Sequence, residues 1–62
     1  MSIKTLASAL DQSTKIIIFW MDKDGGIISD SEMTAEEAKG EDFEVSNITA
    51  EEYGVISCDA CR

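Results

Sequence analysis

Residues 15–21 read Lys15-Ile-Ile-Ile-Phe-Trp-Met21 and include the longest wholly apolar run of this 62-residue chain. The run is rich in β-branched and aromatic residues and has no polar stripe at helical spacing, which predicts a β-strand. Side chains alternate along a strand. One face therefore carries Ile16, Ile18 and Trp20, and the other carries Ile17, Phe19 and Met21. Both faces are apolar, which is typical of a strand inside a sheet.

Two arrangements would bury such a strand. In the arrangement that the sequence favours, one helix covers each face of the sheet. In the alternative, so short a chain cannot cover both faces, and a second copy or a partner closes one of them. An exposed large apolar side chain forgoes about 1.5–3 kcal/mol, so an uncovered face would be a self-association site made of Ile17, Phe19 and Met21.

The flanking segments predict a small single α+β domain. Ser2 precedes apolar residues at helical spacing, which predicts a helix over residues 3–11. Residues 22–26 have turn chemistry, so residues 15–29 should form a hairpin. One or two more strands are expected within residues 42–58, giving a short antiparallel sheet packed with the N-terminal helix and a short middle helix. The domain would span 1–62, with the helix and apolar strand in 1–21 and an acidic part in 22–62.

The tetrapeptide Thr-Ala-Glu-Glu occurs twice, at residues 34–37 and 49–52. In each copy a threonine stands three positions before a glutamate, which is the pattern of a helix capping box. The sequence therefore predicts a helical turn at both places, with Gly40 ending the first and Gly54 cutting the second short.

Charge is distributed unevenly along the chain. Residues 22–62 hold twelve of the thirteen acidic residues and a local charge of −9, whereas residues 1–21 carry +1, for a total of −8. A surface with this negative charge repels nucleic acid and anionic membranes and attracts proteins with Lys/Arg-rich grooves.

The apolar run is far shorter than the roughly 20 residues of a membrane span, and the first residues lack the apolar core of a signal peptide. We therefore expect a cytoplasmic protein.

Residues 22–32 resemble the calcium loop of EF-hand proteins. Asp22 and Asp24 match the first and third ligands of that loop, and Glu32 matches its closing glutamate. The segment has eleven residues rather than about twelve, and it lacks the acidic ligand before the turn glycine. We therefore interpret it as a hairpin turn.

Cys58 and Cys61 form a Cys-x-x-Cys pair. The pair ends a predicted strand rather than beginning a helix, and Asp59 disfavours a thiolate, so a thioredoxin-like redox role is not expected. Zinc needs four ligands, and the chain has two cysteines and no histidine, so a zinc site would require two copies sharing both thiols. Free thiols and a disulfide remain as alternatives.

The residue types argue against an enzyme. Without histidine the chain has no Ser-His or Cys-His pair and no ordinary base near neutral pH. Its four aromatic residues occupy alternating positions typical of a core, so we expect no base-stacking platform.

The function that fits best is a small acidic module that binds and inhibits or modulates a basic, nucleic-acid-processing protein. Such a module would act as a nucleic-acid mimic, in the manner of accessory proteins of viruses or mobile elements. The expected contacts are Glu36, Glu37, Glu41, Asp42, Glu44, Glu51 and Glu52. The alternative is a homodimeric structural or regulatory adaptor linked by a metal held through Cys58 and Cys61.

Overall fold

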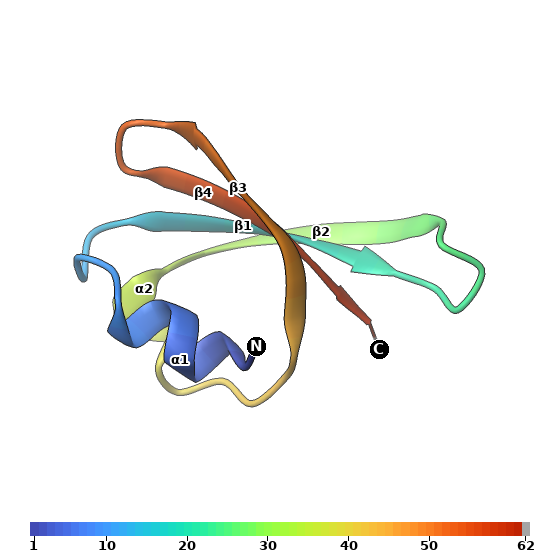
Figure 1. Cartoon of the computed structure of the whole chain (residues 1–62), viewed down its shortest axis with the longest axis horizontal. Coiled ribbons are helices and arrows are strands. Elements are labelled where there is room, and N and C mark those ends of the chain that lie inside the picture. Colours follow the sequence, from blue (N-terminus) through green and yellow to red (C-terminus); the bar gives the residue numbers. More distant parts are fainter. Residues whose placement is uncertain (62) are drawn as a thin grey trace.

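A computed structural model describes residues 1–61 and confirms a small α+β domain. Two short helices accompany one four-stranded sheet with the strand order β2-β1-β4-β3 (Figure 1). The elements are α1 (Ile3–Ser8), β1 (Lys15–Met21), β2 (Ile27–Thr34), α2 (Ala35–Ala38), β3 (Val45–Glu52) and β4 (Val55–Cys61).

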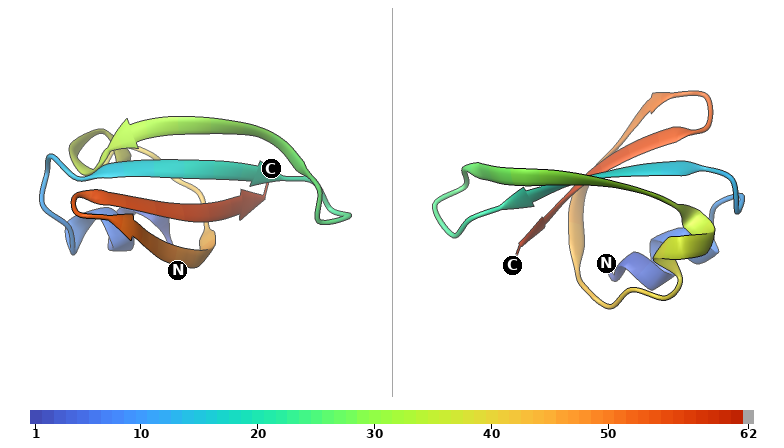
Figure 2. Two further views of the ribbon diagram at one scale, coloured as in Figure 1. Left: turned by 90° about the horizontal axis from the view of Figure 1, so that it is seen from above. Right: turned by 180° about the vertical axis from the view of Figure 1, so that it is seen from behind.

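The sheet is mixed rather than wholly antiparallel. The hairpins β1–β2 and β3–β4 are each antiparallel, but β1 pairs with β4 in parallel across the middle of the sheet. The chain leaves β2 through α2, crosses to the far edge to form β3, and returns as β4 alongside β1 (Figure 2). Local turn chemistry predicts each hairpin but carries no information about how the two hairpins join, and the parallel pair arises at that join.

Both helices lie on the same face of the sheet, as the two ribbon views show (Figures 1 and 2). The expectation of one helix over each face is therefore wrong. The backbone N–H groups of Ala35 and Glu36 donate to the carbonyls of Thr14 and Gln12, at 2.8 and 3.2 Å. These bonds hold the start of α2 against the loop that follows α1, so α2 is fixed on the side already occupied by α1.

The core fills the space between the helices and the sheet. Ile16 and Ile18 of β1 are completely buried, and Trp20 is 8% exposed. They pack against apolar residues of both helices and against Val45, Cys58 and Ala60. The Trp20 indole donates to Ser31 Oγ at 3.0 Å, and its ring lies 4.8 Å from that of Phe43. Ile16, Ile18 and Trp20, which the alternation places on one face of β1, thus form its core face.

The two Thr-Ala-Glu-Glu copies adopt different structures. The first forms the predicted capping box: Glu37 N–H donates to Thr34 Oγ1 at 3.2 Å, and Thr34 N–H donates to Glu37 Oε1 at 3.0 Å. The second copy lies in β3, so the predicted helical turn there is wrong. Glu52 pairs with Val55 across the turn at residues 53–54, where Gly54 has φ of 78°. Pairing with β4 gives this copy the hydrogen bonds that a helical turn would otherwise supply.

Candidate protein-interaction surface

The acidic side chains are almost entirely at the surface. Eleven of the thirteen are exposed, and the other two, Asp22 and Asp59, are half-buried. Within residues 1–61, the single ion pair joins Lys15 Nζ to Glu32 Oε1 at 3.2 Å. The chain's own lysines therefore neutralise little of its negative surface.

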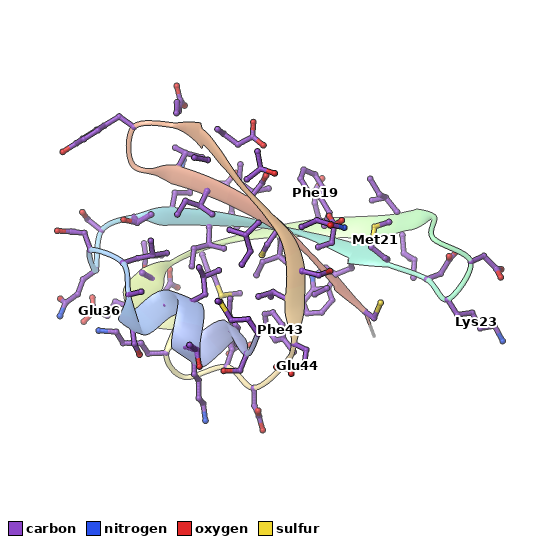
Figure 3. The ribbon with its side chains drawn as sticks, in the orientation of Figure 1. Phe19, Met21, Lys23, Glu36, Phe43 and Glu44 are labelled. Atoms are coloured by element: carbon purple, nitrogen blue, oxygen red, sulfur yellow. The ribbon has the colours of Figure 1, made fainter. Side chains whose placement is uncertain are left out.

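The seven predicted contact residues fall into two groups. Five lie in α2 and the connection to β3, on the helix side of the sheet, and we call them the helix-side acidic group: Glu36, Glu37, Glu41, Asp42 and Glu44. Figure 3 shows Glu36 and Glu44 on this side. The other two, Glu51 and Glu52, end β3 at the β3–β4 hairpin, which points away from the helices (Figure 1). The structure does not bring all seven together.

The N-terminal residues help to position the helix-side acidic group. Ile3 N–H donates to the Phe43 carbonyl at 2.9 Å, and Val45 N–H donates to the Met1 carbonyl at 2.8 Å. A bridge between Ser2 and Glu44 lies between these two bonds. The connection that carries Glu44 is therefore tied to the start of the chain.

The sheet face opposite the helices, which we call the open face, is covered by neither helix. Ile17, Phe19 and Met21 lie on it and are half-buried, and Figure 3 shows Phe19 and Met21 pointing away from the helices. The structure therefore leaves one face of the sheet uncovered, in place of the two-sided covering that the sequence favours. Whether a second copy occupies it, as the self-association hypothesis holds, stays a prediction.

Carboxylates lie on both sides of this apolar row. Phe19 is in register with Asp30 of β2 and with Asp59 of β4. Ile17 is in register with Glu32 on one side and Ser57 on the other. The Ser57 hydroxyl donates to Glu51 Oε1 at 2.6 Å, and Asn47 Nδ2 donates to Asp59 Oδ2 at 2.9 Å. An apolar centre with an acidic border is thus built into the open face.

The sequence-based contact set omits three of these four border carboxylates, namely Asp30, Glu32 and Asp59. Alternation along β2 would have placed Asp30 and Glu32 on one face. Only the parallel β1–β4 pairing brings Asp59 beside Phe19, and nothing in the local sequence indicates that pairing.

The two cysteines point to opposite faces of β4. Cys58 is in register with Ile18 of the core face and is 1% exposed, whereas Cys61 is in register with Met21 of the open face and is exposed. Burial raises the pKa of the Cys58 thiol, and the Asp59 carboxylate raises that pKa further. Residues three apart in a strand have Cα atoms about 10 Å apart, too far for a disulfide. Sharing zinc through both thiols, which stays a prediction, would require the end of β4 to leave the sheet.

Residues 22–26 form the predicted hairpin turn. Asp22 Oδ1 accepts hydrogen bonds from the backbone N–H groups of Asp24 and Gly26, both at 2.9 Å. Gly25 takes the positive φ of 87° that the turn requires. The Asp22 carboxylate therefore organises the turn, while Glu32 lies along β2 and pairs with Lys15.

Tyr53 does not occupy the core position expected for it. It lies at the tip of the β3–β4 hairpin and is fully exposed, because the second Thr-Ala-Glu-Glu copy continues as a strand into a tight turn. Trp20 is in the core, Phe43 packs against it, and Phe19 lies on the open face.

In the described part of the chain there is no cluster of three or more metal-ligating side chains and no enclosed pocket. Neither α1 nor α2 has the length and apolarity of a membrane-crossing helix.

No protein-family model, curated protein or solved structure matches this chain. The arguments about function therefore rest on the surface itself.

Proposed function

We propose that this protein binds a basic protein through its acidic surface and inhibits or modulates that protein, with nucleic-acid-processing enzymes as the partner class. The observation that carries the proposal is the net charge of −8. Eleven carboxylates are exposed, and within residues 1–61 a single ion pair, between Lys15 and Glu32, neutralises one of them. A field of this sign raises the association rate with a positively charged cleft.

The density of charge supports imitation of a single nucleic-acid strand. The longest dimension of the molecule is 32 Å. One strand of B-form DNA would carry about 9 phosphates over that length, and a duplex about 19. The net charge of −8 is close to the single-strand value and less than half the duplex value. The basic groove of a protein that holds one strand is therefore the better match.

The test is affinity capture from lysate of the source, followed by a rise in salt. A basic nucleic-acid-binding protein should be retained at low salt and released as salt screens the contact. The triple variant Glu41→Lys, Asp42→Lys and Glu44→Lys, which changes the net charge from −8 by two units per substitution to −2, should retain far less of it. Asp24→Lys, in the distant β1–β2 turn, is the control. Equal retention by the wild type and a folded triple variant would refute the proposal.

A further inference from the structure

The open face has the composition of an interface core with a charged rim. Its apolar row runs along β1, and Ile27 of β2 extends it, because Ile27 is in register with Met21. Ile27 is 62% exposed. Protein interfaces combine a desolvated apolar centre with a polar border, and the open face has both. The open face is therefore the part of the surface best suited to close contact.

The spacing of the rim matches the width of a helix. Asp30 and Asp59 belong to the strands on either side of β1 and share the register of Phe19. Neighbouring strands lie about 4.8 Å apart, so the two backbone positions are about 10 Å apart. A helix with its side chains is about 10–12 Å across. A helix lying along β1 could contact Phe19 with its underside and reach a carboxylate on each flank.

A second copy of this chain is a poor occupant of the open face. In a two-fold dimer the same surface meets itself, so the rim of Asp30, Glu32, Glu51 and Asp59 would face an identical rim. Among the strand residues within 1–61, Lys15 is the one cation of that face, and it already pairs with Glu32. Like charges brought together in this way oppose association.

We infer that the open face binds a basic amphipathic helix of another protein. The helix lies along β1, places an apolar stripe over Ile17, Phe19 and Met21, and directs Lys or Arg from both borders of that stripe to the carboxylates of β2 and of β3–β4. The inference rests on the proposed function and adds to it the docking surface and the chemistry of the partner segment. The helix-side acidic group then steers the partner by long-range attraction, while the open face holds it.

The probe is a synthetic peptide of about 15 residues, which as a helix is as long as β1, about 23 Å. It carries a leucine stripe bordered by lysines on both sides. A second peptide has the same composition with the leucines scattered around the helix. The striped peptide should bind more tightly and shift the amide resonances of β1, β2 and β4, and the Trp20 indole resonance on the core face should stay in place.

Matched variants test the surface. Phe19→Thr removes the aromatic ring but leaves a residue that is still favourable in a strand. It should weaken binding of the striped peptide at least about tenfold. Asp30→Asn with Asp59→Asn should weaken it by about tenfold, because two rim contacts are lost. Glu36→Gln with Glu41→Gln changes the net charge equally on the helix side and should change the affinity less than about threefold.

Equal binding of the two peptides, or equal losses in the two double variants, would overturn the inference, because charge alone would then explain binding. A dimer in sedimentation experiments that dissociates in Phe19→Thr would also overturn it, with a second copy as the occupant. A natural basic partner that ignores the open-face variants but requires Glu41 and Glu44 would refute the docking surface and leave the proposed function intact. Specific binding of the striped peptide to the open face, with no basic protein captured from lysate, would support the surface and refute the proposed function.

Discussion

Replacing the same threonine in the two Thr-Ala-Glu-Glu copies tests how tertiary structure overrides a local pattern. Thr34→Val and Thr49→Val each remove a hydroxyl while keeping the β-branched shape. At Thr34 the lost oxygen accepts the Glu37 N–H bond of the capping box, and loss of such a cap costs about 1 kcal/mol. In a domain of this size that loss lowers Tm by about 4–8 °C. The free energy of unfolding is expected to be only about 3–5 kcal/mol, so the change is a substantial fraction of the total.

Removal of the Thr49 hydroxyl should destabilise the protein much less. The residue is exposed in β3, and its hydroxyl donates only to the Asn47 carbonyl at 3.4 Å. Valine is at least as favourable as threonine in strands, so Thr49→Val should change Tm by less than about 2 °C. Thermal unfolding followed by far-UV circular dichroism provides both values in one experiment. Equal destabilisation by the two substitutions would refute the assignment of the second copy to a strand.

Three further predictions follow from the burial of only one face of the sheet. Ile18→Ala should remove about 2–5 kcal/mol from the free energy of unfolding and leave the chain largely unfolded. Ile17→Ala on the open face should lower the free energy of unfolding by only about 1 kcal/mol. Similar losses for the two variants in denaturant titrations would contradict the placement of the helices. Cys61 should react with a thiol reagent within the mixing period and Cys58 only as the protein unfolds. Rapid labelling of both thiols at neutral pH would argue against a buried Cys58. Because folding raises the pKa of Cys58, the free energy of unfolding should be unaffected by this thiol below its ordinary pKa of 9.0. The free energy of unfolding should decline as the pH rises above that value.

Local chemistry predicted much of this fold. Three features depend on residues close together in the chain: the alternation in β1, the Ser2 cap and the Asp22 turn. At the cap, Thr5 N–H donates to Ser2 Oγ at 3.2 Å. The parallel β1–β4 pair and the placement of both helices on one face depend on contacts between distant segments. The candidate surface likewise combines a local and a long-range feature. Its acidic content is evident from composition, whereas the acidic border around Phe19 forms only because β4 pairs with β1.

The distribution of charge has a consequence for how a partner would associate. Carboxylates of the helix-side acidic group lie away from the apolar row and act on an approaching partner through the field of the whole molecule. Substitutions there should mainly lower the association rate and its salt dependence, whereas substitutions at Phe19 should mainly raise the dissociation rate. The two surfaces can therefore be separated by kinetics as well as by affinity.

The most direct test of a charge-driven function is the dissociation constant of the captured complex measured over a series of salt concentrations. If the acidic surface binds a basic protein, affinity should fall steadily as salt rises, and the fall should be shallower for the variant with Glu41, Asp42 and Glu44 changed to Lys. An affinity that is independent of salt and identical in the wild type and this variant would contradict the account, because the exposed carboxylates would then contribute nothing to binding.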